Sequence, residues 1–179
     1  MNPVMRHRLF GLAIALAIFL VDQLVKRWVT GPLGLERLGD QLYILPFFNF
    51  TLTHNYGVSL GMFTADSMEM RWILVGVTGL IALVVTVWML REKAMGDIVA
   101  LALILGGALG NIKDRYDLGY VIDYADLHFG DFRPFLVFNI ADAAITFGVL
   151  IILARSFLLR EKKDKKIDDA EVSDVLAEN

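Results

Sequence analysis

Four apolar segments, each long enough to cross a lipid bilayer as a helix, constrain the fold of this 179-residue chain more than any other feature. They lie at about 8–29, 72–90, 96–116 and 135–159. A helix needs roughly 20 mostly apolar residues to cross about 30 Å of hydrocarbon. Bare strands cannot replace such helices, because lipid leaves the backbone groups of an open sheet edge unpaired. We therefore predict a mainly α-helical membrane protein with four transmembrane helices.

The first apolar segment has some features of a cleavable signal peptide, since Arg6 and Arg8 precede the apolar run Leu9–Val21. A signal peptide would end in a small-x-small cleavage site. The residues that follow, Asp22–Trp28, do not form one. Because further apolar segments lie downstream, we predict that this segment is retained as the first transmembrane helix.

Four crossings place both termini on the same side of the membrane. With the termini inside, ten of the 17 Lys and Arg residues lie on the inner side and seven on the outer side. This excess favours cytoplasmic termini. We predict one membrane domain over residues 1–160, followed by a charged cytoplasmic tail over 161–179 whose composition is typical of disorder.

The stretch between the first two helices is predicted to form a small β-sheet on the outer face. Apolar and polar residues alternate over Phe48–His54, which is typical of a strand, and Gln41–Leu45 would be its partner. Asp66, with Glu69 three residues later, resembles a capping box at the start of the second helix. Residues 116–134 are predicted to form a second surface loop.

Polar residues in or beside the apolar segments all fall toward the outer side. The first and third segments run outward and carry these residues at their ends, whereas the fourth runs inward and carries them in its first turns. One charge at the centre of a span costs roughly 2.5–3.5 kcal/mol, so such residues are candidates for function. The candidates are Asp22, Lys26, Asn55, Gly57, Asn111, Asp114, Arg115, Asp123, Asn139 and Asp142.

Asp123 and Asp142 are the candidates for catalysis. Asp142 lies inside an apolar segment, and Asp123, in an outer loop, could face it. Two carboxylates close together in an apolar pocket do not both ionise easily, so the pair holds one proton. The ionised member can then take a proton from water while the protonated member donates to a carbonyl oxygen, as in aspartic peptidases. The alternative is two structural acids, one on a surface loop and one at a helix cap.

Composition excludes several other kinds of chemistry. The chain has no cysteine, which rules out disulfides, thiolate metal sites and a cysteine nucleophile. His7, His54 and His128 are too scattered for a close metal motif, and we expect no metal and no cofactor. The net charge of −3 indicates no nucleic-acid partner. Gly57–Gly61 matches the letters of a GxSxG nucleophile elbow, but the predicted fold lacks the α/β sheet which that motif requires.

Five short motifs occur in order along nearly the whole chain. They are Asp22-x-x-x-Lys26, Asn55-x-Gly57, Gly110-Asn111-x-x-Asp114-Arg115, Val121-Ile122-Asp123-Tyr124 and Phe138-Asn139-x-Ala141-Asp142. On a four-helix plan they resemble the lipoprotein signal peptidase family, bacterial signal peptidase II. The resemblance implies that Asp123 and Asp142 are the catalytic dyad. It implies cleavage of prolipoproteins just before a diacylglyceryl-modified cysteine, in a bacterial inner membrane, without metal. It also implies a small sheet and a short helix on the outer, periplasmic face.

The other candidates are expected to bind substrate or to support the site. Expected substrate-binding residues are Asn55, Gly57, Asn111, Arg115 and Asn139. Each has a structural alternative. Asn111 and Arg115 could serve helix packing, Asn55 and Gly57 could form a turn, and Asn139 could cap a helix. Asp22, Lys26 and Asp114 are expected to support the site structurally, the first two as an i,i+4 ion pair.

Two other functions stay open at the level of sequence. A proton-coupled transporter would place its carboxylates near the midplane, often in repeated halves, whereas here they gather at one side and no repeat is visible. A non-enzymatic scaffold would leave the carboxylates within the apolar segments unexplained. We expect a monomer that contacts membrane lipid and a lipidated prolipoprotein. Tyr56, Lys113 and Tyr124 depart from the family's usual residues and bear on substrate preference more than on activity.

Overall fold

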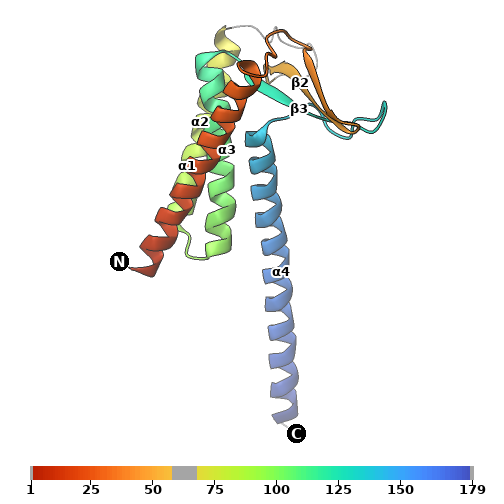
Figure 1. Cartoon of the computed structure of the whole chain (residues 1–179). Coiled ribbons are helices and arrows are strands. Elements are labelled where there is room, and N and C mark those ends of the chain that lie inside the picture. The colour runs from red at the N-terminus through yellow and green to blue at the C-terminus, as the bar shows by residue number, and fades with distance from the viewer. Residues whose placement is uncertain (1, 58–67, 178–179) are drawn as a thin grey trace.

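The computed structural model describes residues 2–57 and 68–177, and the side chains of 2–57 and 68–158. Its elements are, in chain order, α1 (Pro3–Thr30), β1 (Gln41–Leu45), β2 (Phe48–Asn55), α2 (Met68–Arg91), α3 (Met95–Asp117), β3 (Val121–Leu127) and α4 (Ile140–Ala177). The four helices run along one another, and the strands lie at one end of the bundle (Figure 1). We call this end, where α1 and α3 finish and α4 begins, the sheet end.

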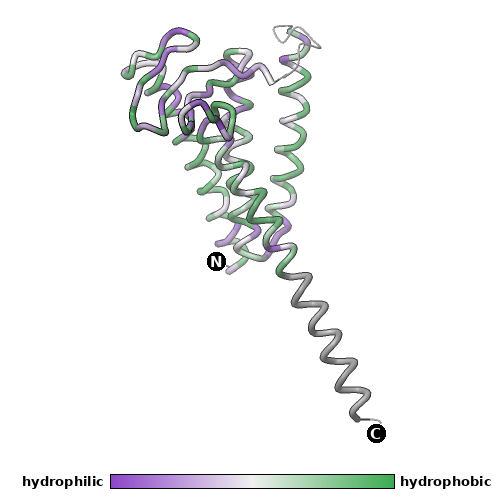
Figure 2. The backbone as a smooth tube through the Cα atoms, turned by 90° about the vertical axis from the view of Figure 1, so that its right-hand side faces the viewer, coloured by the Kyte–Doolittle hydropathy of each residue, from purple (hydrophilic) through white to green (hydrophobic). Residues whose placement is uncertain are grey.

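Four helices are long and apolar enough to cross a membrane, which confirms the predicted number of spans; they cover Pro3–Thr30, Met68–Arg91, Met95–Asp117 and Ile140–Leu158. Hydrophobic residues follow the helices over most of their length (Figure 2). The first span begins at Pro3 and not at residue 8, because Asn2 caps it. Its Oδ1 accepts a hydrogen bond from the Val4 N–H at 3.0 Å, and Pro3 needs no partner for an N–H at the first helical position.

The fourth span begins at Ile140, five residues later than predicted. Phe138 pairs instead with the sheet: its N–H donates to the Ala125 carbonyl at 3.1 Å, and its carbonyl accepts from the Ala125 N–H at 2.7 Å. A continuous apolar run such as Phe135–Phe138 has no periodicity that separates an extended segment from a helix. The sequence therefore could not show where the helix starts.

The sheet has three antiparallel strands in the order β1-β2-β3. The two predicted strands are confirmed, β2 with one further residue at its end. The surface loop predicted over 116–134 is wrong at Val121–Leu127, which forms β3. Asp123 therefore lies on a strand. Most of β3 is buried on both faces, so the alternation that identifies a half-exposed strand is absent.

The end of α4 also differs from the expectation. The helix continues to Ala177, whereas the tail 161–179 was predicted to be disordered. After Gly148 the chain contains no glycine or proline up to that point, and it is rich in Lys, Glu and Ala, which favour helix. Composition alone indicates that such a segment lacks a core, but not whether it is helical.

Some expectations lie outside the described residues. The turn Val58–Gly61 and the cap at Asp66 belong to the segment that is not described. Within 2–57 and 68–177 no separate short helix lies at the sheet end.

α3 is the central helix and packs against α1, α2 and α4. Ile98, Leu101 and Leu105 of α3 are buried together with Ala15 of α1 and Met89 of α2. This cluster lies within the bundle and fixes α3 between its neighbours. The polar end of α3 is thereby held beside α1 and α4.

Two glycines of α3 let the helix backbones approach closely. A Cβ at Gly106 would lie 2.5 Å from the Ala15 carbonyl oxygen of α1, and one at Gly107 would lie 2.4 Å from the Ala141 carbonyl oxygen of α4. Neither contact is compatible with a side chain unless a backbone moves. The first turn of α4 is therefore held directly against α3.

Gly107→Ala is expected to lower the free energy of unfolding by about 1–3 kcal/mol, because overpacking a close contact costs that much. Gly79→Ala in α2 is the matched control, since no heavy atom lies within 4 Å of the added Cβ. There the change should stabilise by up to ~1 kcal/mol through helix propensity. Equilibrium unfolding in mixed micelles measures both. Equal stabilities of the two variants would contradict the close packing of α3 on α4.

Candidate active site

The predicted site residues come together at the sheet end, from five different elements. Asp123 lies on β3, Asp142 in the first turn of α4, and Asn111, Asp114 and Arg115 in the last two turns of α3. The remaining candidates are Asp22 and Lys26 of α1, Asn55 at the end of β2, Gly57 just after it, and Asn139 immediately before α4. The alternating direction of the helices explains this convergence.

Asn139 and Asp142 form a reciprocal cap at the start of α4. The Asn139 Oδ1 accepts a hydrogen bond from the Asp142 N–H at 2.9 Å, and the Asp142 Oδ2 accepts from the Asn139 N–H at 3.3 Å. This is the geometry of a capping box, with Asp in place of the usual Glu. The cap fixes the side chain of Asp142 at the helix N-terminus, where a negative charge is favoured.

The same asparagine also contacts the other aspartate. The Asn139 Nδ2 donates to Asp123 Oδ1 at 2.6 Å, and lies 3.2 Å from both the Ile122 carbonyl and Asn111 Oδ1. Asn111 in turn donates from Nδ2 to Asp142 Oδ1 at 2.8 Å. Two asparagines therefore hold the carboxyl groups of Asp123 and Asp142 within one hydrogen-bonded group.

Asp123 is almost completely buried, with 2% of its surface exposed, whereas Asp142 is half-buried. Burial, reinforced by the negative charge of Asp142, raises the pKa of Asp123 to about 7. Hydrogen bonds from Asn55 and Asn139 and the charge of Lys26 oppose this shift only in part. Near neutral pH the pair can therefore hold one proton, which is the state that acid–base hydrolysis by two carboxyl groups needs.

Arg115 lies beside this pair with unused hydrogen-bonding capacity. Its guanidinium is close enough to Asp142 and Asp123 for both charges to act on it. Its buried Nε has no hydrogen-bond partner among the described residues. Gly57 lies beside this guanidinium at a φ of 82°, a conformation that favours glycine. A Cβ there would make an ordinary contact of 3.5 Å with Arg115 Nη2 and a close one of 2.8 Å with Leu74 Cδ1. Asn55 Oδ1 accepts from the Gly57 N–H at 2.8 Å and fixes this turn.

A buried ion network lies behind the pair. Lys26 Nζ lies 2.8 Å from Asp22 Oδ2 and 2.7 Å from Asp114 Oδ2, and it also donates to Asn111 Oδ1 at 3.2 Å. These three charged side chains are between 0% and 4% exposed. Asp22 Oδ1 accepts from the Ala141 N–H at 3.1 Å, so the network also holds the first turn of α4.

Comparison with known proteins identifies the family. A family model described as signal peptidase (SPase) II matches residues 14–158. The chain belongs to the signal peptidase II family. This is a family of aspartic peptidases, so the chain is an aspartic endopeptidase and neither the transporter nor the scaffold alternative holds.

Relatives of the chain extend over most of its length. A lipoprotein signal peptidase of Sphingopyxis alaskensis is 58% identical over 161 residues, which cover 90% of this chain and 91% of that protein. One of Rhizorhabdus wittichii is 52% identical over 157 residues, covering 88% and 91%. A solved structure titled as a bacterial membrane enzyme at 2.3 Å resolution has a TM-score of 0.72 at 27% identity, covering 87% of this chain and 91% of that one. The predicted four-helix fold with a small sheet is confirmed.

Gln23 belongs to the buried polar network beside the candidate site of this signal peptidase II family member, and it was missed in the sequence. Its Nε2 donates to Asp114 Oδ1 at 2.8 Å and lies 3.3 Å from both the Gly110 carbonyl and Asp22 Oδ2. Asp114 Oδ2 in turn accepts from the Ile122 N–H at 3.2 Å, next to Asp123. The only signal for Gln23 was an uncharged polar residue beside Asp22 within an apolar segment.

Two apolar pockets lie beside the site, one lined by Asp142 and the other by Asn139. One, of about 250 Å³, is lined by Phe135, Phe138, Asp142, Ala143, Thr146 and Phe147. The other, of about 280 Å³, is lined by Val25, Phe48, Phe50, Tyr124, Ala125, Phe138, Asn139, Ile140 and Ala143. The side chain of Phe138 and that of Ala143 border both. The dyad therefore lies where buried polar groups meet a surface suited to hydrocarbon.

Lys113 and Tyr124 were expected to depart from the family's usual residues, and the structure shows what each contacts. Lys113 forms an exposed ion pair with Asp117, away from the buried network. Tyr124 is 3% exposed and packs edge-on against Phe50, with ring centroids 5.5 Å apart. Neither side chain makes a hydrogen bond to Asp123 or Asp142 within the described part of the chain. No cluster of three or more His, Cys, Asp or Glu that could hold a metal occurs among the described residues.

Proposed function

We propose that the chain removes the signal peptide from diacylglyceryl-modified prolipoproteins by cutting just before the lipidated cysteine. The observation that carries the proposal is the position of the dyad. The Asn139 side chain donates a hydrogen bond to Asp123 and accepts one from the Asp142 N–H, and Asp142 lines an apolar pocket. Such a site suits a peptide bond beside a hydrocarbon chain. The names of relatives that are 58% and 52% identical support the same assignment.

In the proposed mechanism Asp123 holds the shared proton at rest. Its raised pKa supports this, and Asp142 is suited to be the ionised member because it accepts from Asn111 Nδ2 and from the Asn139 N–H. Asp142 takes a proton from water, whose oxygen attacks the scissile carbonyl carbon. Asp123 donates its proton to the carbonyl oxygen. The carbon–nitrogen bond of the intermediate then breaks, the leaving amine receives the proton held by Asp142, and Asp123 recovers its own.

The other site residues then fall into two groups. Asn111 and Asn139, which contact the carboxyl groups directly, orient the dyad. Arg115, whose Nε beside Gly57 has no hydrogen-bond partner among the described residues, is the best placed to bind the carbonyl groups of the substrate backbone. Asn55 fixes the turn at Gly57 next to it. The two apolar pockets would take the acyl chains of the modified cysteine.

The chain is a multi-pass membrane protein, and we further propose its orientation. Lys and Arg predominate at the end opposite the sheet, which favours cytoplasmic termini and a site at the periplasmic face of the inner membrane.

Cleavage of matched substrates tests this function. Purified protein in lipid bilayers is given the same prolipoprotein with and without the diacylglyceryl group on its cysteine. We expect cleavage before the modified cysteine, and at least about 100-fold slower cleavage of the unmodified substrate, since hydrocarbon buried in the two pockets contributes roughly 0.8 kcal/mol per methylene. Mass spectrometry of the products identifies the bond that is cut. Equal rates for the two substrates would contradict the proposed recognition of lipid.

A further inference from the structure

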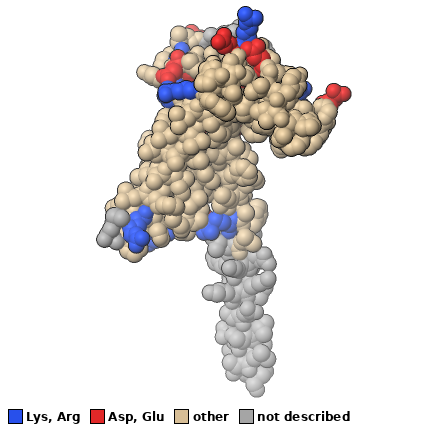
Figure 3. All heavy atoms as spheres, in the orientation of Figure 1, with Lys and Arg blue, Asp and Glu red and all other residues tan. Residues whose placement is uncertain are grey.

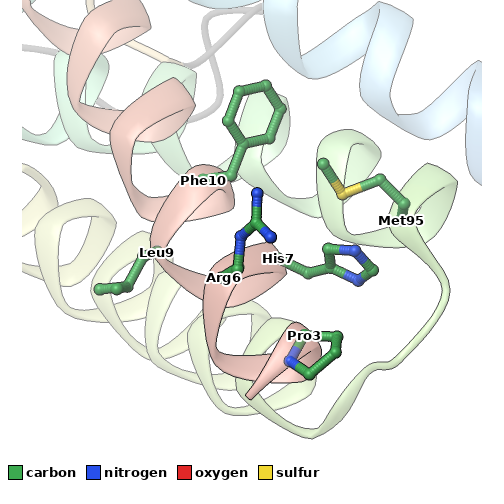
Figure 4. Close-up of a pocket in the computed structure, with 6 residues that line it drawn as sticks. All are labelled: Pro3, Arg6, His7, Leu9, Phe10 and Met95. Carbon is green, nitrogen blue, oxygen red and sulfur yellow. The ribbon is translucent and has the colours of Figure 1, made fainter. Parts of the chain in front are cut away.

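A third cavity lies far from the dyad, at the end of the bundle opposite the sheet. It has a volume of about 570 Å³ and is lined by Pro3, Arg6, His7, Leu9 and Phe10 of α1 and by Met95 of α3. In Figure 4 the His7 ring projects from α1 on the side where Met95 lies, and the guanidinium of Arg6 lies between His7 and Phe10. We call this cavity the basal pocket. Nothing in the proposed peptidase mechanism uses it.

The polar groups of the basal pocket lack partners. His7 Nδ1 is buried without a hydrogen bond, and within the described part of the chain Arg6 makes no ion pair. The acidic side chains described at this end are already engaged. Asp97 holds Arg155, with 2.7 Å between Oδ1 and Nε, and Glu92 Oε1 accepts from the two backbone N–H groups that follow it. An anion from outside the chain would satisfy the free donors.

Apolar residues of a membrane-crossing helix form much of the wall of the basal pocket. Leu9 and Phe10 are 48% and 51% exposed and belong to the first span, so their outer surfaces face hydrocarbon. Arg6 lies one turn nearer the end of the helix. The pocket therefore lies where acyl chains meet headgroups. On the face drawn in Figure 3, Lys and Arg are seen at this end and Asp and Glu only at the other, a charge pattern that attracts anionic lipid.

We propose that the basal pocket binds the phosphate headgroup of an anionic phospholipid. Arg6 and His7 hold the phosphate oxygens, and Leu9, Phe10 and Met95 contact the glycerol and the first part of the acyl chains. A lipid is favoured over a free phosphate ion because only a lipid has apolar groups that contact the apolar walls of the pocket. The site would fasten the start of α1 to the start of α3 at the membrane surface.

Native mass spectrometry of the full chain tests the proposal. The protein is released from micelles that contain equal amounts of phosphatidylglycerol and phosphatidylcholine with identical acyl chains, and the retained lipids are counted. We expect selective retention of phosphatidylglycerol, about tenfold weaker in Arg6→Gln, which corresponds to ~1.4 kcal/mol. Met95→Trp, which fills the pocket without changing charge, should have a similar effect. Circular dichroism shows whether each variant is folded. If Met95→Trp does not fold, the test rests on Arg6→Gln alone.

Arg91→Gln is the matched control, since Arg91 is an exposed arginine near the same end that does not line the pocket. It should retain phosphatidylglycerol as the unaltered chain does. An equal loss in Arg91→Gln and Arg6→Gln would overturn the proposal in favour of diffuse charge attraction, as would equal retention of both lipids. Displacement of the lipid by excess glycerol 3-phosphate would show a site for soluble phosphate and would also overturn it. The readout is binding, so it is independent of cleavage.

Discussion

Asp142→Asn and Asp123→Asn are each expected to lower the rate of cleavage by about 10³-fold or more. A positioned general acid or base contributes roughly 10²–10⁴ to a rate, and in a dyad each carboxyl group acts as both in turn. An amide can neither take the proton of water nor give one to the carbonyl oxygen. Loss of either member therefore stops the same step, and the double variant should be no slower than the single ones.

Both variants should keep the fold, because the hydrogen bonds around the dyad mostly require acceptors. Asn139 Nδ2 donates to Asp123 Oδ1, and both Asn111 Nδ2 and the Asn139 N–H donate to the carboxylate of Asp142. In Asp123→Asn the carbonyl oxygen of the new amide can accept the bond from Asn139. In Asp142→Asn it can replace only one of the two acceptor oxygens, so this variant loses one hydrogen bond, at a cost of about 1 kcal/mol. Asp123 is only 2% exposed, so its replacement by a neutral residue also removes the cost of ionising a buried acid.

Rates are measured with the lipidated substrate, beside the thermal unfolding of each variant. Asp131→Asn is the matched control, since Asp131 is an exposed acid in the segment that joins β3 to α4. It should cleave at the rate of the unaltered chain. A folded Asp123→Asn or Asp142→Asn variant that cleaves within about tenfold of that rate would show that the aspartate concerned is structural.

Much of this site could be predicted because helix direction determines the depth of a residue. Asp22, Asn111 and Asp142 are separated by up to 120 positions, yet each lies near the end of its apolar segment that is found at the sheet end of the bundle. Alternating spans therefore bring them to one end of the bundle, whatever their exact packing. The reciprocal cap was also visible in principle, as Asn139 three residues before Asp142.

What could not be predicted depends on contacts between segments. β3 carries Asp123 and Asp126 at positions that are buried on the strand, so neither its composition nor its periodicity is typical of a sheet. Asp126 is compensated by Thr51 and Arg133, which lie on other segments. The role of Gln23 likewise depends on Asp114, 91 positions away. Local patterns carry no information about such pairs.

Lys26→Met is expected to lower the free energy of unfolding by about 3–5 kcal/mol. The substitution keeps the apolar stem of the side chain but leaves two buried carboxylates, Asp22 and Asp114, without their shared cation. Removing one partner of a buried ion pair costs about this much, because the charge of the other partner is left uncompensated in a medium of low dielectric constant. Cleavage should fall as well, since Lys26 also holds Asn111, which orients Asp142.

Lys113→Met provides the matched control for this change. Lys113 also pairs with an aspartate four positions away, but its side chain and that of Asp117 are 37% and 43% exposed. Exposed pairs contribute about 0–1 kcal/mol, so this variant should be nearly as stable as the unaltered chain. The two substitutions are chemically identical, and the difference between their unfolding free energies in mixed micelles therefore measures the effect of burial.

A triple variant separates the loss of charge balance from the loss of packing. In Asp22→Asn/Lys26→Met/Asp114→Asn no buried charge of the network is left, and replacing a whole buried ion group by neutral residues is often nearly neutral for stability. It should therefore recover most of the stability lost in Lys26→Met. If the triple variant is no more stable than Lys26→Met, the lysine acts through its packing against α3 and not through its charge. If Lys26→Met itself is as stable as Lys113→Met, the network contributes nothing to holding α1, α3 and α4 together.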